Sequence, residues 1–449
     1  MFIDFLINIF KSNQESEAIV WESEVFTYRW LLKRYKYWQN KVKLEGIKKG
    51  AVAIVEADFS PNSVALLLAL IDHGCIFVPI TASVESKRDE FIEIAEGEVL
   101  FKIDKNDVVK ISRLNKKSNH QIYQSLKKSG HPGLVLFSSG STGKSKASVH
   151  DITGILEKFR IQRYRFRTIT FLLYDHIGGF NTLLYTLSNS GLIVTVNERS
   201  PDGVLGMVDK YNVELLPTSP TFINLILLSE AYKRHDISSL KTLTYGTEPM
   251  PESTLKRFNQ LFPEIRLLQT YGLSEVGILR SKSKSSDSLW VKVGGEGFET
   301  RIIQGMLEIK AKSAMLGYLN APSPFTEDGW FKTGDAVEIS GEYIKILGRK
   351  SEIINVGGEK VYPQEVENIV QGIVNVAEVT VYGEKNPIMG NIVCARVRLI
   401  KNEDKKSFIN RLKIHCQKKL QNYKIPVKVD IVGLEQYNNR FKKIRTLSS

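Results

Sequence analysis

A loop rich in glycine and hydroxyl side chains offers the clearest chemistry in the sequence. Ser138-Ser-Gly-Ser-Thr-Gly-Lys-Ser-Lys146 directly follows the apolar run Leu134–Phe137. A short apolar run bounded by turn residues is typical of a buried strand, which would deliver the loop to its place. Small residues let backbone N–H groups approach phosphate oxygens, hydroxyls add donors, and lysines supply compensating charge. The segment therefore predicts a phosphate-binding loop.

The loop departs from the P-loop of conventional nucleotide hydrolases. That pattern requires a glycine five residues before Gly143, and this chain has Ser138 there. A conventional P-loop enzyme is therefore disfavoured. A flexible surface turn is the alternative that this segment alone leaves open.

Further along the chain, other short segments combine glycine with a carboxylate or an aromatic residue. In chain order they are Tyr245-Gly-Thr-Glu-Pro249, Gln269-Thr-Tyr-Gly-Leu-Ser-Glu275, Trp330-Phe-Lys-Thr-Gly-Asp335, Leu347-Gly-Arg-Lys-Ser351 and Gly357-Gly-Glu-Lys-Val-Tyr-Pro363. With the phosphate-binding loop, this ordered set resembles the adenylate-forming (AMP-binding) superfamily, which includes acyl-CoA and aryl-CoA synthetases, peptide-synthetase adenylation domains and luciferases. The likeness spans about residues 134–367, and a weaker likeness extends upstream to Leu67–Ile80.

The resemblance implies a two-step reaction. A carboxylate would attack the α-phosphate of ATP, pyrophosphate would leave, and the acyl group would then pass to a thiol. A carboxylate is a poor nucleophile and repels a triphosphate, so the site must neutralise charge and hold both reactants in line. We therefore expect a small-molecule carboxylic acid as substrate, with ATP, Mg²⁺ and either CoA or the phosphopantetheine of an acyl carrier protein.

The resemblance also implies a set of ATP-binding residues. Thr142, Ser139 and Ser141 would hold the β- and γ-phosphates, while Lys144 and Lys146 would neutralise them. The full expected set is Ser138, Ser139, Gly140, Ser141, Thr142, Gly143, Lys144, Lys146, Gly246, Thr247, Glu248, Pro249, Thr270, Tyr271, Gly272, Asp335 and Arg349.

Other residues have individual roles in the resemblance. Glu275 and Thr142 would bind the Mg²⁺ ion. Tyr271 would lie against the adenine. Asp335 would accept the ribose hydroxyls, with Arg349 approaching the ribose or a phosphate. Each has an ordinary structural alternative: Glu275 could cap a helix that begins beside it, Tyr271 could be a core residue, and Asp335 could be a turn residue.

His176 marks the expected acyl pocket. It lies in Tyr174-Asp-His-Ile-Gly-Gly-Phe180, where many relatives carry an aromatic residue or histidine that gates the pocket, although a satisfied structural histidine is the alternative. Gly178 and Gly179 permit either close packing or a deeper acyl tunnel. Amino-acid-activating relatives place an aspartate at the start of this segment, and Asp175 is not there, so amino-acid substrates are less favoured. The pocket residues suggest an aromatic or medium aliphatic acid.

The C-terminal segment departs from the resemblance. The family usually ends with a Gly-Lys-Ile-type loop whose lysine contacts the reacting carboxylate and the α-phosphate, whereas this chain ends Tyr437-Asn-Asn-Arg-Phe-Lys-Lys-Ile-Arg445. Aligning on Lys-Ile selects Lys443, and aligning on the terminal arginine selects Lys442. Both lysines join Glu275 and His176 as candidate catalytic residues. If neither lysine reaches the α-phosphate, the segment is a cationic tail.

The elements that must position these residues alternate between strand and helix periods. Apolar runs such as Ala51–Val55 and Gly191–Val196 alternate with helical stretches such as Pro61–Ile71 and Pro251–Phe262. This alternation predicts α/β layers with largely parallel sheets. From Val291 to Leu347 the spacing of short strands and glycine turns tightens, which indicates a β-rich subdomain.

A different pattern follows Lys350. The expected elements are helices at Pro363–Gln371 and Lys406–Gln421 and strands at Val379–Val381 and Ile392–Val397. We therefore expect a large N-terminal AMP-binding domain of α/β layers plus the β-rich subdomain over residues 1–349, and a small, mobile α+β lid domain over residues 350–449. Lys350 would be the hinge.

Composition narrows the class of protein and the cellular compartment to be expected. Its hydrophobic content of 42% allows a full core, and its three cysteines are too few and too scattered for a disulfide framework or a zinc cluster, which fits a reducing cytoplasm. The longest apolar run inside the chain, Val64–Ile71, is too short to span a membrane. The apolar segment Met1–Phe10 is expected to be a docking helix and not a signal peptide.

The charge distribution bears on the partner. The chain of 449 residues has a net charge of +13, and residues 350–449 contain 18 Lys and Arg against 10 Asp and Glu. A basic lid would suit ATP and then the phosphates of CoA or an acidic carrier protein, although solvated surface lysines are the alternative. Nucleic acid is disfavoured because no recognisable binding module is present. The main prediction is an acid–thiol ligase that makes an acyl-CoA; the alternatives are an enzyme that loads a carrier protein and a non-catalytic nucleotide-binding scaffold.

Overall fold

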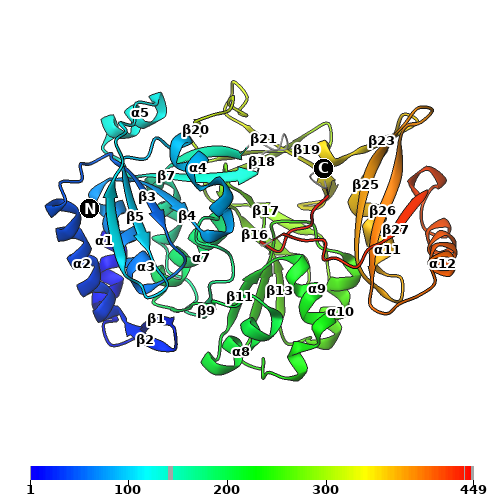
Figure 1. Ribbon diagram of the computed structural model, residues 1–449, viewed down its shortest axis with the longest axis horizontal. Coiled ribbons are helices and arrows are strands. Elements are labelled where there is room, and N and C mark those ends of the chain that lie inside the picture. Colours follow the sequence, from blue (N-terminus) through cyan, green and yellow to red (C-terminus); the bar gives the residue numbers. More distant parts are fainter. Residues whose placement is uncertain (1, 140–144, 439, 446–449) are drawn as a thin grey trace.

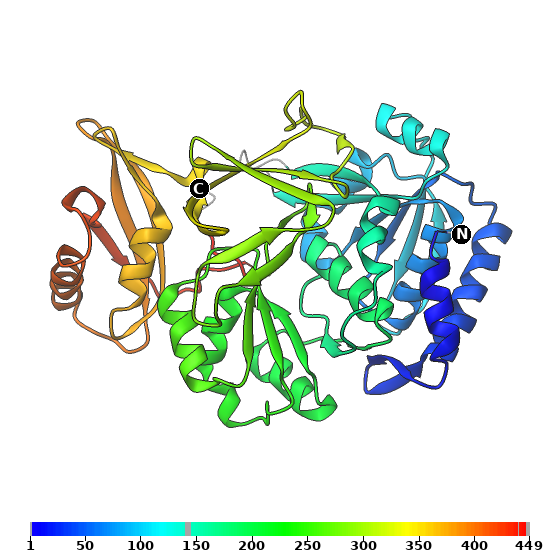
Figure 2. The ribbon, with the colours of Figure 1, turned by 180° about the vertical axis from the view of Figure 1, so that it is seen from behind.

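The computed structural model describes residues 2–139, 145–438 and 440–445. The N-terminal elements lie at one end of an elongated molecule and the last helix and strands lie at the other (Figure 1). The C-terminal segment, dark red in both views, returns from the far end toward the middle (Figures 1 and 2).

The first sheet has the strand order β13-β12-β11-β9-β10-β1-β2. Its strands are β1 (Glu17–Trp21), β2 (Glu24–Thr27), β9 (Arg167–Ile169), β10 (Leu192–Val194), β11 (Leu215–Thr218), β12 (Thr242–Tyr245) and β13 (Arg266–Gln269). Neighbours from β13 to β1 run parallel, and β1 pairs with β2 antiparallel. The helices α7 (Ile177–Ser188), α8 (Pro201–Tyr211), α9 (Pro220–Ser229) and α10 (Glu252–Leu261) connect its strands. Parallel strands share a carboxyl edge, so the segments after β11, β12 and β13 meet there.

The second sheet has the order β20-β8-β7-β4-β3-β5-β6. Its strands are β3 (Val52–Glu56), β4 (Ile76–Ile80), β5 (Val99–Ile103), β6 (Val109–Arg113), β7 (Gly133–Ser139), β8 (Ser145–Asp151) and β20 (Gly317–Tyr318). Its inner strands β7, β4, β3 and β5 are parallel, while β8, β20 and β6 pair antiparallel. The remaining N-terminal helices are α1 (Asp4–Ser12), α2 (Tyr28–Leu44), α3 (Pro61–His73), α4 (Arg88–Ile94), α5 (Gln121–Ser129) and α6 (Ile152–Leu156).

A shared hydrophobic core joins these two sheets. One cluster contains residues of β1, β3, α1, α3 and α7, including Phe10, Ile19, Val55, Leu67 and Leu183, all of them fully buried. Helix α3 is buried from Pro61 to Ile71, which explains why its sequence is apolar all round. Its start is fixed by a capping box in which Ser60 and Ser63 bond each other's backbone N–H groups.

The third sheet is antiparallel throughout its described strands and has the order β16-β17-β22-β21-β19-β18. Its strands are β16 (Arg280–Ser283), β17 (Val291–Gly294), β18 (Phe298–Ile303), β19 (Met306–Ala311), β21 (Phe331–Ser340) and β22 (Tyr343–Arg349). A short hairpin of β14 (Gly272–Leu273) and β15 (Gly277–Ile278) connects it to the first sheet. The expected β-rich subdomain is therefore present.

The segment after β22 builds its own sheet and core. The sheet has the order β24-β23-β26-β25, with β27 paired to β26. Its elements are β23 (Ile354–Val356), β24 (Glu359–Val361), α11 (Pro363–Gln371), β25 (Val376–Asn386), β26 (Gly390–Leu399), α12 (Lys405–Gln417) and β27 (Lys428–Ile431). Figure 1 shows α12 on the outer side of this sheet. The core of this unit is one hydrophobic cluster that includes the fully buried residues Val366, Val381, Val397 and Phe408. This end of the chain therefore packs around a core of its own.

These elements match the sequence predictions with identifiable exceptions. Helix α11 has the predicted bounds, whereas β25 and β26 extend beyond the predicted strands and α12 ends before Gln421. Residues 274–276 form a turn between β14 and β15, so the interpretation of Glu275 as a helix cap is wrong. In the described residues, no helix is both long and apolar enough to cross a membrane.

The glycine pair at the start of α7 is required by close packing. A Cβ on Gly179 would lie 2.0 Å from the carbonyl oxygen of Leu173, and one on Gly178 would lie 2.7 Å from Cδ1 of Leu172. The chain therefore folds back against the first turn of the helix where no side chain fits. Between the two possibilities that the sequence left open, the structure favours close packing.

We expect Gly179→Ala to lower the free energy of unfolding by about 1–3 kcal/mol or more, because overpacking forces the backbone to shift. Gly433→Ala is the matched control, since its Cβ would meet no atom within 4 Å, and it should change stability by no more than about 1 kcal/mol. Urea unfolding followed by circular dichroism measures both. Equal stabilities of the two variants would contradict the packing argument.

Candidate active site

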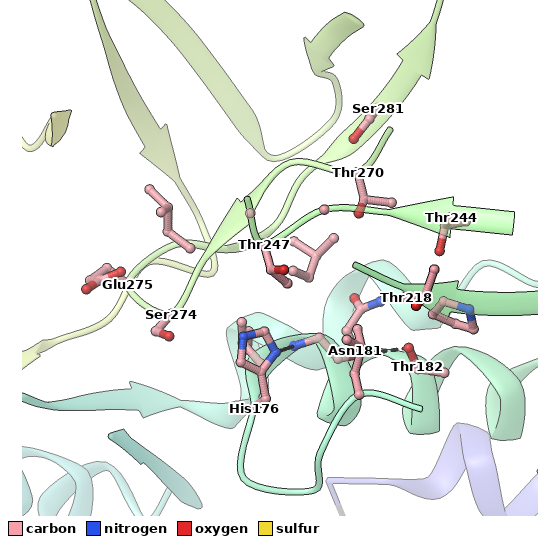
Figure 3. A pocket seen from close by; sticks show the side chains of 18 of the residues that line it. His176, Asn181, Thr182, Thr218, Thr244, Thr247, Thr270, Ser274, Glu275 and Ser281 are labelled. Carbon is pink, nitrogen blue, oxygen red and sulfur yellow. Dashed lines mark hydrogen bonds between the residues drawn. The ribbon is translucent and has the colours of Figure 1, made fainter. Parts of the chain in front are cut away.

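A cavity of about 1140 Å³ opens at the carboxyl edge of the first sheet. Its walls come from α7, the segments after β12 and β13, the third sheet and the C-terminal segment. Figure 3 shows Ser274 and Glu275 at one side of this cavity, His176 and Thr247 near its middle, and Asn181, Thr244 and Thr270 on the other side.

The predicted phosphate-binding loop falls between β7 and β8. These strands pair antiparallel, with Ser138 opposite Lys146, and both residues line the cavity. The ammonium of Lys146 lies 5.3 Å from the ring centre of Tyr318. Gly140, Ser141, Thr142, Gly143 and Lys144 lie outside the described residues, so their predicted contacts are not placed, whereas the backbone of Ser139 pairs with Ser145 at the end of β7.

Asp335 is a buried carboxylate beside the cavity, which its neighbours Thr333 and Gly334 line. It is 5% exposed, accepts a hydrogen bond from the Tyr271 hydroxyl, and lies 3.4 Å from Nε of Arg349. Strand pairing sets this arrangement, because Asp335 on β21 is directly opposite Arg349 on β22. Burial raises the pKa of Asp335, while Arg349 and Tyr271 favour its charged form. The carboxylate is thus held in one orientation by its neighbours.

Tyr271 binds Asp335 and is not among the residues that line the cavity. Its ring is 7% exposed within a hydrophobic cluster of the third sheet, while its neighbours Thr270 and Gly272 line the cavity. Burial, followed by the carboxylate of Asp335, raises the pKa of Tyr271 well above its ordinary value. Its hydroxyl therefore remains a hydrogen-bond donor, and stacking on adenine stays a prediction.

Glu275 projects from the turn between β14 and β15 into the cavity. The Tyr318 hydroxyl donates to Oε1 at 2.7 Å, and the backbone oxygen of Glu275 accepts from the N–H of Met315 at 2.7 Å. The described residues contain no cluster of three or more acidic, histidine or cysteine side chains that could hold a metal. One carboxylate fits Mg²⁺ only where nucleotide phosphates supply other ligands, as this ion commonly requires.

The Gly-Thr-Glu-Pro segment after β12 divides between two surfaces. Gly246 and Thr247 line the cavity. A Cβ on Gly246 would lie 2.6 Å from Oγ1 of Thr270, so the two chains approach too closely for a side chain. Glu248 faces α9, where it accepts the backbone N–H of Thr221 at 2.9 Å, and with Pro249 it lines a separate small cleft. Glu248 therefore lies outside the cavity and binds the start of α9.

His176 begins α7 and faces the cavity. Its Nδ1 accepts the backbone N–H of Gly178 at 3.0 Å, which leaves the proton of the neutral ring on Nε2. Burial, followed by the positive charges of Lys442 and Arg440, lowers the pKa of His176 well below its ordinary value. The imidazole is therefore neutral at physiological pH and presents an N–H donor.

The two candidate lysines occupy different surroundings. Lys442 lines the cavity together with His176 and Thr247. Lys443 turns away, and its ammonium lies 3.1 Å from Glu367 of α11. Burial, followed by repulsion from Arg440, lowers the pKa of Lys442 to about 8.

Contacts that were not predicted from the sequence hold the C-terminal segment in place. The ring of Phe441 lies 5.3 Å from that of Phe171 and 5.2 Å from that of Phe222, and its carbonyl oxygen accepts the Ser219 hydroxyl at 2.9 Å. Arg440 donates to the buried carboxylate of Asp175 at 2.7 Å. In the sequence, Phe441 is an aromatic residue between basic ones in Arg-Phe-Lys-Lys. This pattern was the available sign that the segment has a buried anchor.

Two family models match the chain. The family model described as AMP-binding enzyme matches residues 9–295, and the model described as AMP-binding enzyme C-terminal domain matches residues 365–440.

Several curated relatives are CoA ligases. The chain is 27% identical to an indoleacetate–CoA ligase of Aromatoleum aromaticum, over 59% of this chain and 57% of that protein. It is 26% identical to the long-chain-fatty-acid–CoA ligase FadD13 of Mycobacterium tuberculosis, over 70% and 66%. Each of these matches spans less than two thirds of the relative. A putative acyl–CoA ligase of Bacillus subtilis, YdaB, is 25% identical over 95% of this chain and 94% of that protein.

Solved structures share the fold. The anthranilate CoA ligase AuaEII, determined in complex with anthranoyl-AMP, superposes with a TM-score of 0.82 at 18% identity, covering 99% of this chain and 95% of that one. The expected combination of α/β layers, β-rich subdomain and smaller α+β unit is therefore confirmed.

We expect Asp335→Asn to weaken ATP binding about 10- to 100-fold, since a hydrogen bond to a charged group contributes about 1.5–3 kcal/mol. Tyr271→Phe keeps the carboxylate and should weaken binding at most about tenfold. Calorimetry with ATP measures both effects. Asp328→Asn, which removes an exposed carboxylate paired with Arg301, is the control, and unchanged affinity in Asp335→Asn would contradict the assignment.

Proposed function

Because the chain belongs to the AMP-binding enzyme family, we propose that it activates a carboxylic acid with ATP and transfers the acyl group to the thiol of CoA. The family membership rests on the match over residues 9–295, and the choice of CoA is supported by the names of the curated relatives. In the first step a carboxylate oxygen attacks the α-phosphorus and its bond to pyrophosphate breaks. In the second step the thiol sulfur attacks the acyl carbon, loses its proton, and the carbon–oxygen bond to AMP breaks.

The position of Lys442 carries this proposal. Its ammonium enters the cavity that contains His176, Thr247 and Glu275, and it interacts electrostatically with Glu275 and Arg349. A cation there would bring the reacting carboxylate and the α-phosphate together and would offset the charge that develops between them. The N–H of neutral His176 would orient an oxygen of the acid.

The nucleotide would be held by the remaining walls. Asp335 would accept the ribose hydroxyls, Arg349 would contact the ribose or a phosphate, and Ser138 and Lys146 would approach the phosphates. Glu275 would contribute to the binding of Mg²⁺, which neutralises phosphate charge when it is bound.

In the proposed second step, Lys442 leaves the cavity so that the thiol can reach the acyl carbon. Strand β22 ends at Arg349, a single turn of 3-10 helix spans Lys350–Glu352, and the C-terminal sheet begins at Ile354. We propose residues 1–349 as the AMP-binding domain and residues 350–449 as the lid domain, with rotation at Lys350 exchanging the face presented to the cavity. An acyl carrier protein is the alternative acceptor, and the 18 basic against 10 acidic residues of this lid would favour an acidic carrier.

Exchange of labelled pyrophosphate into ATP, in the presence of a panel of acids, tests adenylation. We expect Lys442→Ala to reduce the exchange rate about 10²- to 10³-fold, the effect typical of removing a group that stabilises developing charge. Lys413→Ala, which removes an exposed lysine of α12, is the control and should retain the rate. Equal loss in both variants would contradict the role of Lys442.

Thioester formation then separates the acceptors. Product with CoA supports the ligase, whereas product with a phosphopantetheinylated carrier and none with CoA would favour the alternative. If ATP binds and no acid in a broad panel supports exchange, the chain is a nucleotide-binding scaffold and the proposed reaction is wrong.

The lowered pKa of Lys442 predicts a pH profile. A lysine with a pKa of about 8 is charged below this pH and neutral above it, so kcat/KM for ATP should fall as the pH rises through about 8. The charged groups that face Lys442 are Arg440, Arg349, Glu248 and Glu275, and His176 beside it is already neutral. Lys442→Arg should retain activity and lose this decline between about pH 7 and 9. An unchanged decline in Lys442→Arg would assign it to another group.

A further inference from the structure

The cavity continues past His176 and Thr247, on the side away from Glu275 (Figure 3). We call this part the acyl channel and define it by Asn181, Thr182, Thr244, Arg266, Thr270 and Ser281. In the proposed reaction the carboxylate lies near Lys442, so the channel receives the rest of the acid. Its side chains therefore bear on the substrate class.

One wall of the channel is a face of the first sheet. Thr242 and Thr244 of β12 are opposite Arg266 and Leu268 of β13. All four line the cavity, whereas the alternate residues, such as Leu243, are buried in the core on the other face. From Thr270, next to the proposed reaction site, the wall extends back to Arg266, a span on the order of 10 Å at the rise of a strand.

The opposite wall is α7. Gly178, Asn181, Thr182 and Tyr185 share one helical face and line the cavity. Thr182 donates its hydroxyl to the Gly178 carbonyl at 2.8 Å, so this hydroxyl can only accept a bond from a ligand. Asn181 and the hydroxyl of Tyr185 are thus the side-chain donors that this helix wall can offer.

A lysine outside the channel orients the amide of Asn181. The ammonium of Lys158 donates to Oδ1 of Asn181 at 2.5 Å and to the carbonyl oxygen of Ile278 at 2.9 Å. Because a lysine only donates, it requires the oxygen of Asn181 on its side. The Nδ2 group is then left without a protein partner among the described residues and is available to an acceptor in the channel.

Positive charge accumulates at the distal end. Lys158 contacts no carboxylate in the described part of the chain, but burial, followed by repulsion from Arg280 and Arg163, lowers its pKa to about 7. The positive charge of this end therefore comes from the arginines. Arg163 and Arg266 line the cavity and are exposed, and neither side chain pairs with a described acidic group.

The acidic groups of this region do not offset that charge. Glu214 pairs with Lys241, and Glu296 lies 3.5 Å from Arg280. Glu275 is the one carboxylate among the described lining residues, and it lies at the nucleotide side. The distal channel is therefore cationic, with uncompensated arginines facing the space that the substrate would enter.

We propose that the channel selects a carboxylic acid that carries a second anionic group on the order of 10 Å from the reacting carboxylate. This inference rests on the proposed function. The second anion would pair with Arg163 and Arg266, and an acceptor on the body of the substrate would bond Nδ2 of Asn181. A wholly aliphatic acid of the same length would cover these groups without replacing their water, which is unfavourable.

Three acids of one backbone length test the proposal: octanoate, 8-hydroxyoctanoate and octanedioate. Calorimetry without ATP measures binding, and pyrophosphate exchange measures activation. We expect octanedioate to bind at least tenfold more tightly than octanoate, with 8-hydroxyoctanoate between them. In Arg163→Ala/Arg266→Ala this preference should fall below about threefold, and Lys158→Met, which keeps the length of the side chain, should also reduce it. Arg257→Ala removes an exposed arginine of α10 and should retain the preference.

The two readouts separate the two proposals. Octanoate binding as tightly as octanedioate, no binding by either, or a preference unchanged in the double variant would overturn the inference about the channel. If octanoate is nevertheless activated, the ligase function stands. Selective binding of octanedioate with no exchange for any acid would support the channel assignment and contradict the adenylation reaction.

Discussion

A buried carboxylate determines where the end of the chain runs. Glu367 of α11 is fully buried, accepts the backbone N–H of Val381, and pairs with Lys443 and Arg445. Burial opposes its ionisation, but Lys443 and Arg445 lower its pKa below the ordinary value. Removing one partner from a buried ion pair costs several kcal/mol, so the basic segment is required at this position. Since alternate residues of an extended chain point to opposite sides, pairing residues 443 and 445 with Glu367 directs Lys442 to the cavity.

The same segment is anchored on both sides of the cleft. Phe441 packs against both Phe171 and Phe222, and Arg440 reaches the buried Asp175. Phe171, Phe222 and Asp175 belong to the N-terminal part of the chain, whereas Glu367 belongs to α11 of the C-terminal part. The segment therefore holds the two parts together in the geometry that we propose for adenylation. Because the contacts are aromatic and ionic and few in number, a rotation between the parts could exchange them for others.

Electrostatics organises the cavity into two regions. Glu275 lines one region, and the buried Asp335 lies beside it next to Arg349; in the proposed function these two carboxylates serve a metal ion and a ribose. Beyond His176 the walls combine hydroxyls, an amide and arginines with apolar and aromatic side chains such as Leu268 and Tyr185. A neutral imidazole between the regions suits a reaction in which charge moves from a carboxylate to phosphate oxygens, since it can donate a hydrogen bond without adding a further full charge.

Local sequence patterns were sufficient for the family, for the layers of the fold and for most elements. Helix α11 could be predicted at its bounds because a proline precedes an amphipathic run, and α3 because its buried surface makes it apolar throughout. The glycine-bearing loops could be located because a close approach of two backbones requires glycine, as where Gly246 lies against Thr270. The sequence alone could not show which of Lys442 and Lys443 faces the cavity. The choice depends on Glu367, which lies 76 residues from Lys443 in the chain and binds the opposite side of the C-terminal segment. The cationic channel was equally hidden, since Lys158, Arg163, Asn181 and Arg266 meet only when β13 and α7 face each other. The sequence determined which chemical groups are present near each strand end; tertiary packing decided which of them face the same space, because that depends on pairing between residues far apart in the chain.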